Sequence, residues 1–219
     1  YHGCALLSDG AVKCWGPNAS GQLGNGDSSG VVSPVAVPGL GTTRAVSVGG
    51  DHSCALGDDG LVRCWGNNNH GQLGDGTVSG SVVTPVVVQG LTDVQAISAG
   101  ASFTCGLTAG GTVKCWGRND IGQLGRSELV TPRPAPANVT GLGSGVAAVS
   151  AGLAHVCALT TGGAVMCWGQ NAEGELGDGT TTNASAPVTV SGLANGSAAV
   201  ASGFFHACAL TTSGAMKCW

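Results

Sequence analysis

Ten cysteines carry the most regular spacing in this 219-residue sequence. They form pairs whose partners are ten residues apart, and a tryptophan follows the second cysteine of every pair. The first cysteines of successive pairs are separated by 50, 51, 52 and 51 residues, so the chain repeats about every 51 residues. The pairs are Cys4–Cys14, Cys54–Cys64, Cys105–Cys115, Cys157–Cys167 and Cys208–Cys218.

Each cysteine pair encloses a hairpin signal. In the first copy, the turn residues Asp9-Gly10 lie between two short alternating runs. That register puts Cys4 opposite Cys14, where Cα atoms lie about 4.5 or 5.5 Å apart, within reach of a disulfide. We therefore expect five disulfides and an oxidising compartment, either extracellular or at the cell surface. Free thiols acting as small core residues are the alternative.

Histidine is the second residue type with a fixed position. It stands two residues before the first cysteine in four copies: His2, His52, His155 and His206. On a strand, His52, Cys54 and Cys64 would share a face and could be offered as zinc ligands. Disulfides would consume the sulfurs, and Phe103 replaces the histidine in the third copy. A structural histidine bonded to backbone is therefore the preferred interpretation.

Other residues with catalytic or ligand chemistry have the wrong context. Asp51-His52-Ser53 holds the letters of a hydrolase triad, but consecutive strand residues alternate between faces. Asp75-Gly76 and Asp178-Gly179 lack the neighbouring oxygen ligands of a calcium site. No glycine-rich segment opens a helix, as a phosphate-binding loop would. We expect no catalytic residue, no metal and no cofactor.

Tryptophan recurs in register in all five copies. The residues are Trp15, Trp65, Trp116, Trp168 and Trp219. They could serve as platforms for a carbohydrate or a partner, but packing between repeating units is the preferred interpretation. With eight Lys and Arg and a net charge of −4, the chain lacks the clustered positive charge that nucleic acid requires. No apolar run approaches the roughly 18 residues that would span a bilayer.

The rest of each period predicts two more strands. A glycine-rich loop follows the tryptophan, anchored by one leucine per copy: Leu23, Leu73, Leu124 and Leu176. A strand with a proline comes next and belongs at a sheet edge, because proline lacks a donor. A strand of small residues, such as Ala45–Gly49, then suits a crowded centre. Four antiparallel strands per period predict an all-β protein built of β-propeller blades, with a β-solenoid as the alternative.

The phrase Trp-Gly-x-Asn-x-x-Gly-Gln-Leu-Gly-x-Gly, followed later by Gly-x-x-His-x-Cys-Ala-Leu, resembles the regulator of chromosome condensation repeat family. That resemblance covers the whole chain and implies a seven-bladed propeller. We expect a single partial domain over residues 1–219, an open arc of a little over four blades that self-associates. Its repeats are 4–53, 54–104, 105–156 and 157–207, with a partial hairpin at 208–219. Because the chain begins and ends inside the same phrase, we expect it to be part of a longer protein.

The resemblance also implies a function in protein binding. Family members include an exchange factor for a nuclear GTPase, a plant ultraviolet-B photoreceptor and a secreted bacterial inhibitor of β-lactamases. The photoreceptor's light-sensing tryptophans have no counterpart between the Gly and the His of the repeated phrase. We expect a non-catalytic, secreted or cell-surface propeller of the bacterial type, with unidentified protein partners. The contacts are expected in the variable segments 27–33, 77–84, 126–134 and 180–186. The alternative is an exchange-factor-like regulator of a small GTPase.

Overall fold

The chain is built of strands and turns, and the computed structural model describes all residues 1–219. Its 18 strands form five antiparallel sheets, which confirms the all-β expectation. The structure contains no helix long and apolar enough to cross a membrane. The strands are β1 (Gly3–Leu6), β2 (Val12–Gly16), β3 (Val31–Ala36), β4 (Thr43–Val48), β5 (His52–Gly57), β6 (Val62–Asn67), β7 (Ser81–Val87), β8 (Val94–Ala99), β9 (Phe103–Thr108), β10 (Val113–Gly117), β11 (Arg133–Asn138), β12 (Val146–Ala151), β13 (His155–Thr160), β14 (Val165–Gly169), β15 (Ala184–Thr189), β16 (Ser197–Ser202), β17 (Ala207–Thr211) and β18 (Met216–Cys218).

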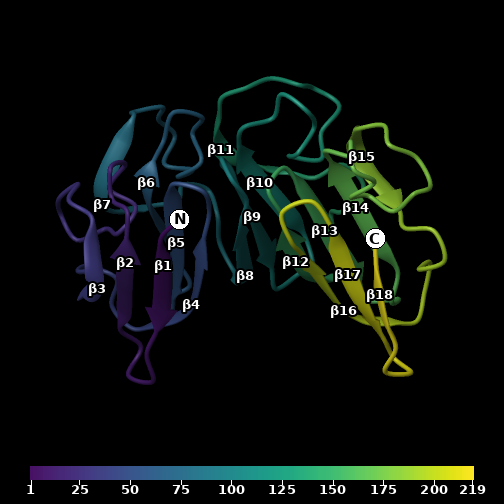
Figure 1. The fold of residues 1–219 in the computed structure, drawn as a ribbon, viewed down its shortest axis with the longest axis horizontal. Helices are drawn as coiled ribbons and strands as arrows, with labels where there is room; N and C mark the ends of the chain where they lie inside the picture. The colour runs from purple at the N-terminus through teal and green to yellow at the C-terminus, as the bar shows by residue number, and fades with distance from the viewer.

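The five sheets follow one another in chain order (Figure 1). The three middle sheets have four strands each, β4-β5-β6-β7, β8-β9-β10-β11 and β12-β13-β14-β15, whereas the first and last sheets, β1-β2-β3 and β16-β17-β18, have three. The long connections 17–30, 68–80, 118–132 and 170–183 leave the sheets at one end, which we call the loop end. The hairpin turns β1–β2 and β17–β18 leave at the opposite end (Figure 1).

The hairpins have the register expected from their turns. Cys4 pairs with Cys14 and Leu6 with Val12, and every later cysteine pair is opposed in the same way. In the first turn, the Asp9 carboxylate accepts a hydrogen bond from the Ala11 amide at 3.0 Å. Short side chains that bond their own backbone in this way favour a tight turn over continued strand.

The proline strands are the outermost strands, as their composition predicts. In the first sheet, β3 pairs with β2 at Val31 and again at Val35, and the ladder is irregular between these two points. Pro34 lies within this irregular stretch, where no ladder hydrogen bond is required of it. The same bulge recurs opposite the tryptophan in the three middle sheets. The repeated proline therefore marks both the sheet edge and its bulge.

The strands of small residues are innermost, but each belongs to the sheet of the following hairpin. Strand β8, which the sequence repeat places after β7, pairs with β9. Neighbouring innermost strands are tied through serine, because Ser47 Oγ accepts a hydrogen bond from the Ala99 amide at 2.9 Å. Ser98 and Ser150 do the same for the next two strands. Sequence repeats and sheets are thus offset by one strand.

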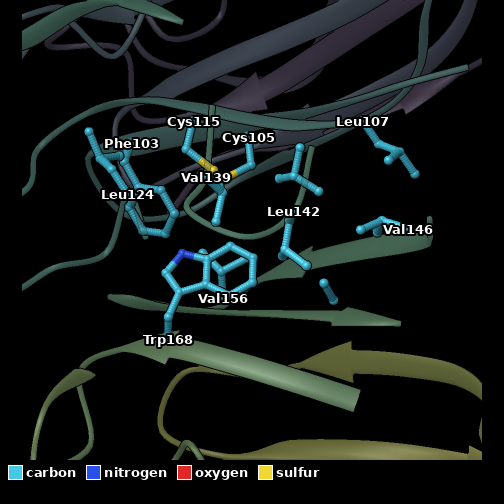
Figure 2. Packing of buried hydrophobic residues seen from close by; sticks show 12 residues of the cluster. Phe103, Cys105, Leu107, Cys115, Leu124, Val139, Leu142, Val146, Val156 and Trp168 are labelled. Atoms are coloured by element: carbon cyan, nitrogen blue, oxygen red, sulfur yellow. A yellow bond between two sulfur atoms is a disulfide. The ribbon is translucent and has the colours of Figure 1, made fainter. Parts of the chain in front are cut away.

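The core lies between the sheets, where the cysteine face of one sheet packs on the tryptophan face of the next. Figure 2 shows this arrangement at the junction of the third and fourth sheets. Cys105 and Cys115 of the third sheet, with Leu124 and Val139 of the connections that follow β10 and β11, pack around Trp168 of the fourth, and all are at most 2% exposed. Aromatic rings bury about 150–250 Å² each, so these junctions supply much of the apolar stabilisation.

Candidate functional site

The cysteine pairs lie within the sheet junctions. Their sulfur atoms are 2.07–2.14 Å apart, and their Cα atoms are 4.1 Å apart in all five pairs. That Cα spacing is close to the shorter of the two distances for opposed residues in an antiparallel pair. The three pairs of the middle sheets are completely buried. These side chains are therefore at disulfide distance and out of reach of a partner or a metal ion.

The tryptophans tie each sheet to the loop of the sheet before it. Trp65, Trp116 and Trp168 are fully buried, and Trp219 is half-buried. The Nε1 of Trp65 donates a hydrogen bond to the carbonyl oxygen of Gln22 at 2.9 Å. The other three tryptophans make the same bond to Gln72, Gln123 and Glu175. Rings held in this way cannot act as exposed platforms for a carbohydrate.

Two of the four repeat histidines, His2 and His52, bond to a hydroxyl group of the next sheet and not, as had been expected, to the backbone. His2 Nε2 lies 2.7 Å from Ser53 Oγ, and His52 Nε2 lies 2.9 Å from Thr104 Oγ1. Both hydroxyls donate onward to the carbonyl oxygens of Gln22 and Gln72. A hydroxyl whose proton is committed in this way can only accept from the histidine. Each of these two histidines therefore carries its proton on Nε2.

The next two junctions lack this hydroxyl. In the third junction an apolar pair takes the place of the histidine and its partner, because Phe103 stands at the histidine position and Val156 at the hydroxyl position. In the fourth junction His155 remains, but Ala207 replaces the hydroxyl, and neither ring nitrogen of His155 has a hydrogen-bond partner. His206 of the last sheet is exposed. The histidine–hydroxyl pair is therefore one of several ways to fill a junction.

Burial keeps the inner histidines neutral. Desolvation, followed by the charge of His2, lowers the pKa of His52 to about 3. Desolvation also lowers the pKa of His155 to about 4, against the opposing charge of Glu175. The three residues Asp51-His52-Ser53 do not form a triad, because the Ser53 hydroxyl donates to Gln22 and meets His2 rather than His52. Ser53 is also fully buried, so no substrate reaches it.

One buried asparagine holds each loop at the loop end. Asn68 Oδ1 accepts a hydrogen bond from the Leu73 amide at 3.1 Å. Asn68 Nδ2 faces oxygens of Asp75, Thr77 and Ser79 at 3.2–3.3 Å. The equivalent asparagines are Asn18, Asn119 and Asn171. A single side chain thus folds each loop back on itself and leaves the segment beyond it free to vary.

Asp75 and Asp178, which the sequence analysis considered as calcium ligands, take part in this loop structure. Both carboxylates accept hydrogen bonds from the backbone amide and the hydroxyl of the threonine two residues later, at 2.8–3.0 Å. The amide nitrogens of Asn68 and Asn171 lie where a cation would have to lie among these oxygens. No group of three His, Cys, Asp or Glu side chains in the structure could hold a metal ion.

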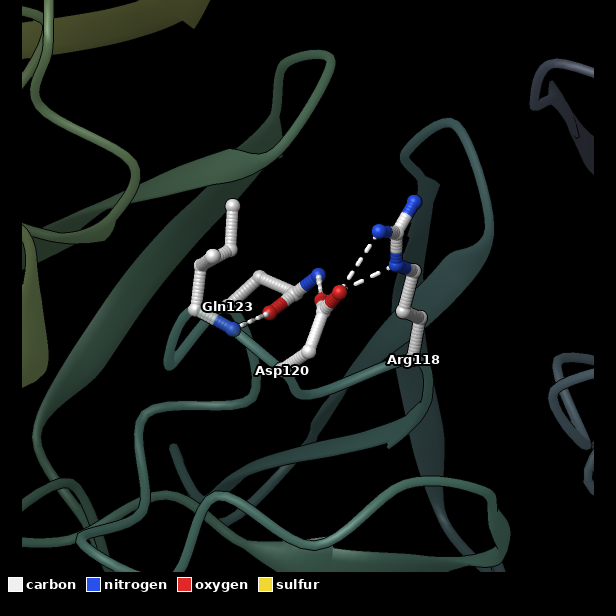
Figure 3. A network of polar contacts seen from close by, with 4 residues as sticks. Arg118, Asp120 and Gln123 are labelled. Atoms are coloured by element: carbon white, nitrogen blue, oxygen red, sulfur yellow. Dashed lines mark hydrogen bonds and ion pairs between the residues drawn. The ribbon is translucent and has the colours of Figure 1, made fainter.

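The third loop departs from the others. Figure 3 shows Arg118 bound to Asp120, which also accepts a hydrogen bond from Gln123 Nε2 at 3.1 Å. The Arg118 hydrogen bond is the main cause that lowers the pKa of the Asp120 carboxyl. Further along, Arg133 binds Glu128 at 2.7 Å. Leu129 and Val130, which follow Glu128, are 54% and 52% exposed.

Sequence reasoning missed two sets of residues in this network. The loop asparagines were not singled out, although their fixed place three residues after each of the first four tryptophans could have revealed a common role. The carbonyl groups of the Gln22 series leave no signal in a sequence, because every residue has a carbonyl.

Comparison with known proteins identifies the repeat. The regulator of chromosome condensation (RCC1) repeat matches residues 9–56, 59–107, 110–159 and 162–210. The chain belongs to the RCC1 repeat family. Human E3 ubiquitin-protein ligase HERC2 is 36% identical to it over 219 residues, which are 97% of this chain and 4% of HERC2. The ultraviolet-B receptor UVR8 of Arabidopsis thaliana is 31% identical over 98% of this chain and 50% of the receptor. The chain thus spans at most half the length of these two relatives.

Solved structures, among them that of yeast RCC1, have the same fold. Human WBSCR16 superposes with a TM-score of 0.86 and 28% identity, over 96% of this chain and 55% of that one. Yeast RCC1 (Prp20), in a complex with Kap60, superposes with a TM-score of 0.85 and 24% identity, over 100% of this chain and 54% of that one. The chain therefore has the RCC1-type β-propeller fold, and the propeller interpretation is confirmed over the solenoid.

Proposed function

We propose that this RCC1 repeat chain is a non-catalytic binding module that holds a protein partner at its loop end. The observation that carries the proposal is the location of large apolar side chains that remain exposed. Eight such residues lie at the loop end or on its loops: Tyr1, Val32, Val48, Val78, Leu129, Val130, Phe204 and Phe205. The other six exposed residues, such as Leu7 and Met216, lie at the opposite end, but at the loop end the rings of Tyr1, Phe204 and Phe205 contact one another. Exposed apolar side chains that cluster in this way are typical of protein interaction sites.

The loops themselves support the proposal. Their buried asparagines and leucines hold the base of each loop, whereas the segments beyond differ between copies. A rigid scaffold with variable loops is a common way to present binding residues. The third loop offers Leu129 and Val130 as a neighbouring apolar pair next to the Arg133–Glu128 ion pair. Apolar contacts with a charged border are typical of protein–protein interfaces.

The fold fits this function as well. In one solved structure Kap60 is bound to yeast RCC1 (Prp20), and a second structure of Prp20p concerns its binding to Gsp1p and histones. These partners are partners of Prp20 and not of this chain. The two Prp20 structures are 24% and 22% identical in sequence to this chain, so they support a common fold alone. The same low identity gives no support to the alternative function as a regulator of a small GTPase.

Five cysteine pairs at disulfide distance support an extracellular or cell-surface location. The test is to count free thiols in protein taken from its native source, denatured and alkylated without reduction. We expect none. A count near ten would refute the location and favour the intracellular alternative.

Site-specific photo-crosslinking tests the binding face. A photoreactive phenylalanine analogue is placed at Val130 on the loop end, and a matched one at Leu61, an exposed apolar residue beside a hairpin turn at the opposite end. In extracts of the native source, we expect a discrete protein adduct from position 130 and none from position 61. Substituting Leu129→Ser in the Val130 crosslinking chain should weaken the adduct. Equal labelling from both ends, or no adduct at all, would contradict the proposal.

A further inference from the structure

The innermost strands end in short turns that stack on one another at the loop end. The Gly50 amide donates a hydrogen bond to the Ala101 carbonyl at 3.1 Å, and the Ala101 amide donates to the Leu153 carbonyl at 3.0 Å. Gly49 permits this close approach, because a Cβ atom there would lie 2.5 Å from the carbonyl oxygen of Gly100. Consecutive sheets are therefore joined backbone to backbone around the centre of the arc.

A pocket of about 350 Å³ opens where these turns converge. All five sheets contribute to it, and no Lys, Arg, Asp or Glu side chain lines it. Val48, Ala101, Leu153 and Phe204 supply much of its apolar wall. The volume falls within the range of sites that bind small molecules, at its lower end. An uncharged group no larger than a few rings fits this space.

Aromatic side chains stand at this pocket. The ring of Phe204 meets Tyr1 at a centroid distance of 5.3 Å and an interplanar angle of 84°, and it meets Phe205 at 6.0 Å and 64°. Phe204 is 45% exposed and Phe205 is 50% exposed. Edge-to-face contacts of this kind extend readily to a third ring, because the edge of one ring is attracted by the face of another.

We propose that this pocket, which we call the axial pocket, binds an uncharged aromatic side chain presented by the protein partner. The inference rests on the proposed function, since it supplies the anchor of the interface at the loop end. Three observations select this occupant: the volume admits one ring system, the wall carries no charged side chain, and Phe204 offers an aromatic contact at the pocket. Aromatic anchors in desolvated pockets dominate many protein interfaces.

The repeat itself provides variants that close the pocket without disturbing the fold. Ala101, Leu153 and Phe204 occupy the same position in successive copies, so larger residues are accommodated at this turn. Ala101→Phe should fill the axial pocket, and Leu153→Ala should enlarge it. Leu61→Ala at the opposite end is the matched control, because it also removes an exposed apolar side chain. Thermal unfolding shows whether each variant keeps its fold.

The test is a titration with N-acetyl-L-phenylalaninamide, observed through methyl NMR signals of the intact chain. We expect shifts confined to Val48, Ala101 and Leu153 and none with the lysine analogue. Affinity should fall at least tenfold in Ala101→Phe. In Phe204→Ala the loss of one aromatic pair should cost about two- to tenfold. The Leu61→Ala control should bind unchanged. Shifts scattered over the surface, or equal binding by Ala101→Phe, would overturn the proposal.

The same variants separate this inference from the proposed function. If Ala101→Phe abolishes probe binding but the Val130 crosslink persists at full strength, the partner binds the loop end without using the axial pocket, and the inference fails alone. If the probe binds the pocket as expected but no crosslinked partner is found, the pocket stands as a ligand site and the proposed function fails.

Discussion

The second and third sheet junctions differ in one pair of residues, and this difference predicts the effect of a double substitution. His52 donates to Thr104 in the second junction, whereas Phe103 and Val156 fill the equivalent positions of the third junction without any polar group. We expect the double substitution His52→Phe/Thr104→Val to convert the second junction into a copy of the third. The two single substitutions should behave very differently from the double one.

Thr104→Val alone removes the acceptor of a fully buried donor. Both His52 and Thr104 are 0% exposed, so the His52 N–H cannot turn to water. An unsatisfied buried donor costs about 1–3 kcal/mol of unfolding free energy. In the double variant the donor is gone as well, and the free energy of unfolding at pH 8 should return to within about 1 kcal/mol of the parent protein. The difference is an interaction energy that a double-mutant cycle measures.

Acidity adds a second and independent readout. The pKa of His52 is 6.5 as a free group and about 3 in the folded protein. As the pH falls below 6.5, the unfolded chain takes up a proton that the folded protein refuses, so stability is lost between about pH 6.5 and pH 3. At pH 5 this single histidine should cost roughly 2 kcal/mol relative to pH 8. The double variant lacks that loss and should be the more stable protein at pH 5.

Urea unfolding of the oxidised chain at pH 8 and at pH 5 measures these quantities, with each free energy taken from the same denaturation slope. The His155→Phe variant is a useful companion, because burial also lowers the pKa of His155, to about 4. The reasoning is refuted if Thr104→Val is as stable as the parent protein at pH 8. It is also refuted if the double variant loses stability between pH 8 and pH 5 as steeply as the parent.

Three further predictions follow from the same contacts. Trp65→Phe should cost about 1–3 kcal/mol in urea unfolding, because it removes a buried hydrogen bond to Gln22, whereas Trp15→Phe should change little, since Trp15 is half-buried and its Nε1 has no acceptor. Reduction of the disulfides should lower the unfolding free energy by up to ~2–3 kcal/mol per pair, as judged by melting with and without reductant, and an unchanged melting curve would show that the thiols were never bonded. Asn68→Ala should destabilise its loop by about 1–3 kcal/mol and expose the Leu73 amide to hydrogen exchange, and unaltered exchange at that amide would disprove the anchoring role.

Local signals predicted the fold well. The Asp9-Gly10 turn predicted the hairpin register correctly, because the position of the turn decides which residues of the two strands are opposed, here Cys4 and Cys14. Pro34 marked the outermost strand, since a missing amide excludes a central position. The buried leucines of the loops, such as Leu73, were also predicted correctly. Each of these inferences depends on residues close together in the chain.

Contacts between repeats could not be predicted from the sequence. The partner of His52 is 52 residues away, and nothing local distinguishes the Thr104 hydroxyl from any other. The contact between Tyr1 and Phe204 joins the first and last sheets, and it depends on the curvature of the whole arc. The offset between repeats and sheets was also missed, because hydrophobic pattern identifies strands but not the neighbour with which each strand pairs.

That offset limits how this protein can be taken apart or rebuilt. A segment that is one sequence repeat long contains the innermost strand of the next sheet. If such a segment is transferred into another protein, that strand must therefore pair with a hairpin of the recipient. The new contact between sheets also needs the serine whose hydroxyl accepts a hydrogen bond from the next innermost strand, as Ser47, Ser98 and Ser150 do. In the last sheet, Ala201 occupies this place, so an engineered extension from that sheet should restore serine there first.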